Sequence, residues 1–158
     1  FEDVLNPYGA TLNVGRGYDG WSSIHNAATR FIENACDVTV LYFGDFDPSG
    51  EDMVRSLIER LGILGCEPAV IKCALTHDDI VRYDLPPDFA KKSDTRTAAF
   101  VAKHGDISVE LDALPPDVLR DRLEDEVSSR MDLTALERTV KLEKKDRARL
   151  VKLLKGKA

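Results

Sequence analysis

The chain has 158 residues, of which 43% are apolar and 32% charged, and its formal net charge is -6. These values are typical of one soluble globular domain with its own core, and they argue against a broad basic surface for nucleic acid. No apolar run approaches the roughly 20 residues of a membrane span, which predicts a protein without a membrane partner.

Charge and cysteines are unevenly distributed. From Lys141 onward, eight Lys and Arg residues outnumber two acidic ones, so the preceding 140 residues carry a net charge of -12. Such a tail could contact phosphates, although a solvated helix end has the same pattern.

Cys36, Cys66 and Cys73 lack metal-site spacing and fit reduced core thiols of a cytoplasmic protein.

Short strands and helices alternate in the first half of the chain. TLNV (11–14) predicts a brief strand, followed by the turn GRGYDG and a helix with an apolar stripe over 21–31. The apolar run VTVLYF (38–43) predicts a strand covered on both faces. The turn GDFDPSG follows, and Ser49 is a suitable cap for the next helix.

The pattern continues with AVIKCAL (69–75), which predicts another strand. Thr76 and Asp79 have the spacing of a capping box for a short helix. Residues 84–97 lose their periodicity and predict a loop, and 107–114 predict a further strand. Strands that alternate with helices indicate a mostly parallel sheet, with ligands at the carboxyl ends of the strands.

Two helices are expected at the end of the chain. Pro115 and Pro116 open the first, and the second starts near Leu133. We therefore divide the chain into an α/β domain over 9–114 and a helical segment over 115–158, with its basic tail from 141. The second helix has apolar residues at both ends: Leu136, Val140, Leu150, Val151 and Leu154.

Two aspartates follow the strand 38–43. Asp45 and Asp47 are two residues apart, so in extended backbone their side chains leave the same face and can converge. Magnesium prefers oxygen ligands, usually one or two carboxylates with water and phosphate oxygens. The alternative is that one aspartate caps the following helix and the other is a solvated turn residue.

The strand 38–43, the turn GDFDPSG and the following helix resemble the Toprim domain. More narrowly, they resemble the Toprim domain of the A subunit of topoisomerase VI, of the related meiotic double-strand-break transesterase and of their prophage and bacterial relatives. ALTHDDIVRYDLPP, KKSDTR and VELDALPP follow in the order and spacing of that family. The resemblance implies a three-layer α/β fold with a mostly parallel central sheet flanked by helices. It also implies Mg²⁺, or Mn²⁺, bound by Asp45 and Asp47.

The resemblance further implies partners: DNA, a second copy in a homodimer, and an ATPase subunit as in topoisomerase VI. A cytoplasmic, nucleoid-associated protein is the corresponding expectation. The family's tyrosine nucleophile belongs to an amino-terminal domain that this chain does not contain, so the chain is expected to be a fragment. Among the tyrosines, Tyr18 is expected nearest the site, in a packing or phosphate-contact role.

One family residue is missing. Toprim domains usually end the first strand with a glutamate, and here that position falls on Gly15. Asp19 is a possible substitute, and so are Glu110 and Asp112, which would share one face of a strand. We therefore assign Glu110 a catalytic role, with an ion pair to a neighbouring Lys or Arg as the alternative.

Four basic residues are candidates for binding DNA phosphate, because guanidinium and ammonium groups donate to phosphate oxygens. Arg16 lies between glycines and is also a catalytic candidate; the alternative is that it pairs with Asp45 or Asp47 and replaces the metal. The other three all lie in KKSDTR (91–96): Lys91, Lys92 and Arg96.

Three functions follow in order of preference. The first is a magnesium-dependent Toprim domain that binds DNA and assists phosphodiester cleavage or transesterification. The second is a degenerate Toprim module that recognises DNA or a partner without catalysis. The third is a Toprim nuclease that acts on RNA.

Overall fold

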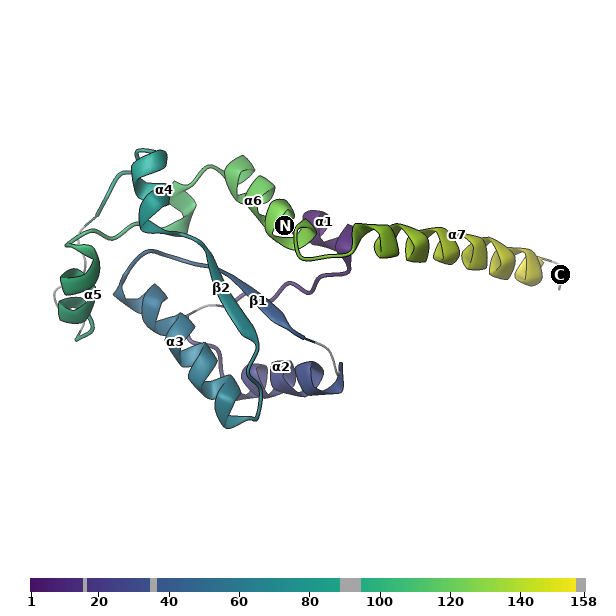
Figure 1. The fold of residues 1–158 in the computed structure, drawn as a ribbon, viewed down its shortest axis with the longest axis horizontal. Helices are drawn as coiled ribbons and strands as arrows, with labels where there is room; N and C mark the ends of the chain where they lie inside the picture. Colours follow the sequence, from purple (N-terminus) through teal and green to yellow (C-terminus); the bar gives the residue numbers. More distant parts are fainter. Residues whose placement is uncertain (16, 35–36, 89–94, 156–158) are drawn as a thin grey trace. The chain divides into compact units, whose positions relative to one another are not determined.

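The computed structural model describes residues 1–15, 17–34, 37–88 and 95–155, and the chain divides into two compact units (Figure 1). One unit is Asn13–Arg122, and the other combines Phe1–Leu12 with Leu123–Ala158. Helix α6 (Pro116–Ser128) contains the boundary between them. Strands and helices are both present, which confirms the α/β class at this coarse level.

The unit Asn13–Arg122 contains a two-stranded parallel sheet. Strands β1 (Thr39–Phe43) and β2 (Ala69–Ala74) pair in parallel, and α3 (Pro48–Ile63) connects them. The prediction that both faces of β1 are covered is wrong, since its described side chains are half-buried or exposed. A two-stranded sheet gives each strand a neighbour on one side only, so the strand is less enclosed than one in the middle of a large sheet.

Two expected strands do not form in the described residues. Residues 10–15 have no regular structure. Within 107–114, only two antiparallel bridges form, Phe46 with Val109 and Asp88 with Ser108, and a 3-10 helix, η2 (Leu111–Ala113), follows. Apolar alternation is not sufficient for a strand, because the ladder also needs a partner that continues its hydrogen bonds.

Two apolar clusters hold this unit together. The smaller lies between α2 (Trp21–Glu33) and α3, whereas Trp21 itself stays 54% exposed beside Arg60. Burial of such apolar side chains is the main stabilising contribution to packing of this kind. The larger cluster contains Phe46, Ala74, Leu75, Ile80, Leu85, Phe100, Val109, Leu114 and Leu119.

Short helices surround the larger cluster. The predicted capping box begins α4 (His77–Arg82): Thr76 accepts from the Asp79 backbone, and the Asp79 carboxylate accepts from the Thr76 N–H. Helix α5 (Thr97–His104), which the sequence did not predict, contributes the buried Phe100. Cys66 and Cys73 are buried, as expected of core cysteines, whereas Cys36 lies outside the described residues.

The second unit contains α1 (Glu2–Leu5), η1 (Asn6–Tyr8), the end of α6 and the 23-residue α7 (Leu133–Lys155). The predicted starts of α6 at Pro116 and of α7 at Leu133 are confirmed. No residue in the described part of α7 is buried. Among the described residues, none of the helices combines the length and apolarity that a bilayer span requires.

Candidate metal and phosphate site

Residues 44–50, which comprise the turn after β1 and the first three residues of α3, are called the acidic turn. Asp47, rather than the expected Ser49, is the N-cap of α3, and its Oδ1 accepts from the Gly50 N–H at 2.5 Å. The Ser49 hydroxyl donates to Asp47 Oδ2 at 2.8 Å. Proline then occupies the first helical position, where it needs no hydrogen-bond partner. The alternative that one aspartate is a helix cap is therefore realised by Asp47.

Gly50 allows the acidic turn to close. A Cβ atom at this position would lie 2.3 Å from the Asp45 carbonyl oxygen, closer than van der Waals contact permits. A side chain at position 50 would therefore require the backbone of the turn to move. The carbonyl oxygen of Asp45 and the start of α3 are thus held in close contact by the backbone itself.

Asp45 is held by two other parts of the unit. Its Oδ1 accepts from the Leu111 N–H at 2.8 Å, and its carbonyl oxygen accepts from Lys72 Nζ at 3.2 Å. Within the described residues, neither Asp45 nor Asp47 forms an ion pair with a cationic side chain. Each carboxylate oxygen has two lone pairs, so both side chains retain acceptor capacity for a cation.

Phe46, between the two aspartates, belongs to the larger apolar cluster. It is 2% exposed and meets Phe100 edge to face with the ring centroids 5.3 Å apart. Its backbone exchanges two hydrogen bonds with Val109, of 2.8 and 3.0 Å. Phe46 is therefore buried, whereas the aspartates on either side of it are half-exposed.

A histidine lies beneath the acidic turn. The ring of His104 is 5.1 Å from that of Phe46, and its Nε2 atom is buried without a hydrogen-bond partner. Burial lowers the pKa of His104, and the neighbouring Lys103 lowers it further. The imidazole is thus neutral at physiological pH.

Lys72 is the cation next to the acidic turn, and the sequence analysis missed it. Its Nζ forms an ion pair with Glu51 at 2.6 Å and lies 5.5 Å from the Phe46 ring centroid. Burial raises the pKa of Glu51, but the hydrogen bond and charge of Lys72 outweigh this effect and keep the pKa below its usual value. The sequence signal that could have identified Lys72 is its position as the single charged residue inside the apolar run AVIKCAL.

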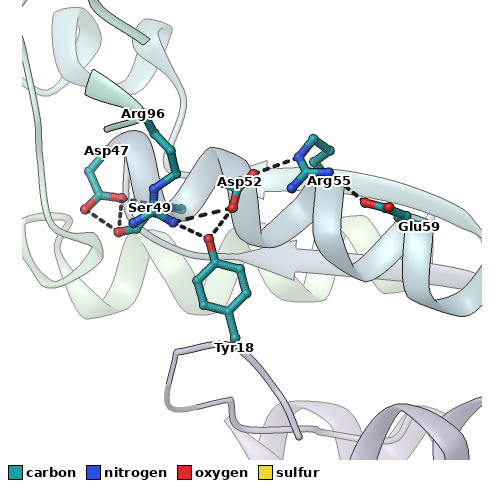
Figure 2. A network of polar contacts seen from close by, with 8 residues as sticks. Tyr18, Asp47, Ser49, Asp52, Arg55, Glu59 and Arg96 are labelled. Carbon is teal, nitrogen blue, oxygen red and sulfur yellow. Dashed lines mark hydrogen bonds and ion pairs between the residues drawn. The ribbon is translucent and has the colours of Figure 1, made fainter. Parts of the chain in front are cut away.

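A network of hydrogen bonds and ion pairs joins Tyr18 and Arg96 to Asp52 on α3, immediately after the acidic turn (Figure 2). The Tyr18 hydroxyl donates to Asp52 Oδ2, and Arg96 donates to the Tyr18 oxygen and lies 3.4 Å from Asp52. Arg55 also binds Asp52, at 2.7 Å. Tyr18, which precedes α2, therefore contacts the start of α3.

The network shifts the pKa values of Asp52 and Tyr18. The hydrogen bond from Tyr18 lowers the pKa of Asp52, and Arg55 and Arg96 lower it further. Burial raises the pKa of Tyr18, and its bond to Asp52 adds to this. A phenol with a raised pKa is a poor nucleophile at neutral pH, which is compatible with the packing or phosphate-contact role expected of Tyr18.

The other predicted site residues lie in different surroundings. Arg16, Lys91 and Lys92 are outside the described residues. Glu110 is exposed and precedes η2, where the next residue, Leu111, donates to Asp45. The expectation that Glu110 and Asp112 share one strand face is wrong, because η2 replaces the strand.

Asp19 is not a helix cap, since the N-cap of α2 is Gly20 and makes no side-chain cap bond. Its carboxylate accepts from Asn13 at 3.4 Å, and its carbonyl oxygen accepts from Arg60 at 2.7 Å. Over the described ranges, no group of three or more His, Cys, Asp or Glu side chains is arranged to hold a metal ion. The fit to magnesium consequently depends on Asp45 and Asp47, two hard oxygen donors.

A buried ion pair stabilises the same unit. Arg122 on α6 binds Asp79 with both terminal nitrogens, at 2.6 and 2.8 Å, and also donates to the Cys73 carbonyl. Asp79 is 4% exposed. Burial raises its pKa, but bonds from Arg122 and Thr76 reverse the shift and hold the pKa below its usual value. The capping box was visible in the sequence, whereas its partner, 43 residues away, was not.

Comparison of the chain with protein-family models, with curated proteins and with solved structures gave no significant match.

Proposed function

We propose that the chain contains a magnesium-binding, Toprim-like domain that binds DNA and assists cleavage of its phosphodiester backbone. The observation that carries the proposal is the acidic turn. Asp45 and Asp47 lie at the carboxyl end of a parallel strand, half-exposed, and without an ion-pair partner in the described residues. Uncompensated carboxylates at this place are the ligands that Mg²⁺ uses beside phosphate oxygens.

The residues of the turn have distinct roles in this proposal. Asp45 and Asp47 would hold the ion, which when bound would neutralise charge on the DNA phosphate. The bonds from Leu111 and Gly50 orient the two carboxylates, so little freedom is lost on binding. Lys72 fixes the backbone of Asp45 from the next strand.

The nucleophile in this proposal is water or a group from outside the chain, because Tyr18 is bound to Asp52 and has a raised pKa. Arg96 also lies in this network, at the start of α3. DNA phosphate that reaches the acidic turn would compete with Asp52 for the Arg96 guanidinium.

A second candidate is a module that recognises DNA or a partner without catalysis. It is favoured by the use of Asp47 as a helix cap and by glycine at position 15, where Toprim domains have a glutamate. The two candidates differ in whether a divalent cation binds at the acidic turn and promotes cleavage.

The experiment is a calorimetric titration of Mg²⁺ and Mn²⁺ into the wild type and Asp45→Asn, with and without duplex DNA. Asparagine keeps an acceptor for Leu111 N–H but removes the charge. We expect wild-type binding that strengthens with DNA and is lost in Asp45→Asn, whereas the exposed Asp106→Asn control binds normally. Absence of binding up to about millimolar metal would favour the recognition module.

A nuclease assay then separates binding from cleavage. Supercoiled and linear duplex DNA, and RNA of matched length, are incubated with protein and Mg²⁺. Cleavage that Asp45→Asn abolishes and Asp106→Asn retains supports the first candidate. Metal binding without cleavage of any substrate supports a domain that depends on an external nucleophile.

A further inference from the structure

We propose that the end of α7 binds the surface of an anionic lipid membrane, with the helix axis lying in the plane of that surface. The terminal segment of α7 is the range 147–155, RARLVKLLK, and each of its residues is exposed. It contains four Lys or Arg residues and no acidic residue. Exposed apolar side chains combined with positive charge are the chemistry that an anionic lipid surface binds.

Large apolar side chains are the first feature of the terminal segment. Leu150 is 60% exposed, Leu153 57% and Leu154 73%, and Val151 beside them is 44% exposed. At 3.6 residues per turn, the three leucines fall within about 100° of arc around the helix axis. They therefore form one face, which would be stabilised by transfer out of water into the boundary between lipid headgroups and acyl chains.

Basic side chains are the second feature, and they surround the leucine face. Lys152 lies on the side of the helix opposite the leucines, and their borders are formed by Arg147, Arg149 and Lys155. The long aliphatic parts of these side chains can lie against apolar surface while their charged ends reach the headgroups. A helix with this distribution presents leucine to the acyl chains and cations to the anionic headgroups.

The preceding turn of α7 limits the extent of this surface. Leu142 is 60% exposed, as Leu150 is, but Glu143 and Asp146 follow it on the side of the helix that carries Leu150. An anionic surface repels these carboxylates. The contact is therefore confined to the terminal segment, which is about 13 Å long at 1.5 Å per residue.

An anionic lipid surface accounts for both features of the terminal segment, whereas other binding partners account for only one. DNA or RNA phosphates would pair with the basic side chains but leave the leucines in water. A second α7 would cover the leucines but bring the positive charges of two terminal segments together. The lipid surface removes the leucines from water and neutralises the basic residues at the same time.

Neither the length of the segment nor the net charge of the chain opposes this binding. The prediction of no membrane partner was based on the absence of a run long enough to span a bilayer, and a helix in the plane of the surface needs no such run. Salt screens charges beyond about 10 Å. The charges of the terminal segment, rather than the net charge of -6, therefore act on a surface that the segment contacts.

The experiment measures co-sedimentation of the full chain with lipid vesicles in a buffer free of divalent cations, so that the result does not depend on the acidic turn. The vesicles contain phosphatidylcholine with about 30% phosphatidylserine, or phosphatidylcholine alone, at up to about 5 mM lipid. We expect the chain to bind the anionic vesicles. Binding should be at least about tenfold weaker without phosphatidylserine, or when salt is raised from about 0.1 to about 0.5 M.

Two substitutions test the leucine face. Leu150→Ser and Leu154→Ser should each weaken binding to the anionic vesicles at least about fivefold, because each removes one leucine from that face. Leu142→Ser is the matched control, since it removes a leucine with the same exposed fraction as Leu150 from outside the terminal segment. It should bind like the wild type, and circular dichroism should show equal helix content in all variants.

Two results would overturn the proposal. The first is a wild type that stays in the supernatant with anionic vesicles at every lipid concentration. If such a chain binds duplex DNA, the terminal segment is a phosphate-binding tail; if it doubles in mass, a second copy covers the leucines. The second is vesicle binding that Leu150→Ser and Leu154→Ser both leave unchanged, since charge alone would then hold the chain to any polyanion.

Discussion

Substitution of Asp47 separates its role as a helix cap from its proposed role as a metal ligand. The carboxylate accepts from the Gly50 N–H and the Ser49 hydroxyl, and both bonds are lost in Asp47→Ala. Loss of an N-cap costs about 0.5–2 kcal/mol, and loss of a negative charge at a helix start adds about 0.3–1 kcal/mol. We therefore expect Asp47→Ala to lower the free energy of unfolding by about 1–2 kcal/mol.

Asparagine caps helices about as well as aspartate, so Asp47→Asn should lose under about 1 kcal/mol, the contribution of the charge. As a neutral ligand, however, it should weaken Mg²⁺ binding by at least about tenfold, since affinity depends on the number of ligand charges. Urea denaturation gives the stability and calorimetry the affinity. Ser49→Ala is a control that keeps the carboxylate and should retain metal binding.

Two results would refute this reasoning. If Asp47→Asn were as unstable as Asp47→Ala, then the cap bond to Gly50 would not be what Asp47 contributes to stability. If Asp47→Asn bound Mg²⁺ as tightly as the wild type, Asp47 would be a cap alone and the site would lose one of its two proposed ligands. The metal proposal would then depend on Asp45.

Three further predictions concern stability. Arg122→Ala should lower the free energy of unfolding, measured by urea denaturation, by about 3–5 kcal/mol because it leaves the Asp79 carboxylate buried without its cation. Arg82→Ala, at an exposed residue, should lower it by under about 1 kcal/mol, and equal losses would contradict the prediction. Gly50→Ala should cost about 2 kcal/mol or more, since its Cβ would meet the Asp45 carbonyl, and an unchanged midpoint would disprove the contact. The pKa values of Asp79 and Glu51 are lowered in the fold, so their carboxylates stabilise it at pH values above their unfolded pKa of about 4. The free energy of unfolding should therefore fall as the pH drops below about 4, and less steeply in Arg122→Ala. Identical pH profiles would exclude Asp79 as a source of this pH dependence.

Local patterns in the sequence determined several elements. Two proline residues before an apolar stripe predicted the start of α6, and T-x-x-D predicted the cap of α4. The apolar runs before Gly44 and Thr76 predicted β1 and β2. Each of these signals depends on residues within a few positions of one another, where propensity and hydrogen bonding act directly.

The alternation D-F-D also predicted that Phe46 and the two aspartates leave the backbone on opposite sides; Phe46 is buried, and both aspartates are half-exposed. The tertiary structure decided what each side meets: Phe100 and His104 on one, the Leu111 N–H on the other. The Asp47 carboxylate is bound by its neighbours Ser49 and Gly50, whereas the hydrogen bond to the Asp45 carboxylate comes from Leu111, 66 residues away.

The remaining features were decided by contacts that are distant in the sequence. Residues 107–114 have the alternation of a strand, yet they form two bridges and η2, because a ladder requires a continuous partner. Lys72 reaches the acidic turn only because β1 and β2 are parallel neighbours. Arg122 binds Asp79 because the fold brings α6 next to α4. Local propensity specifies the elements, whereas long-range packing specifies which charges they bring together.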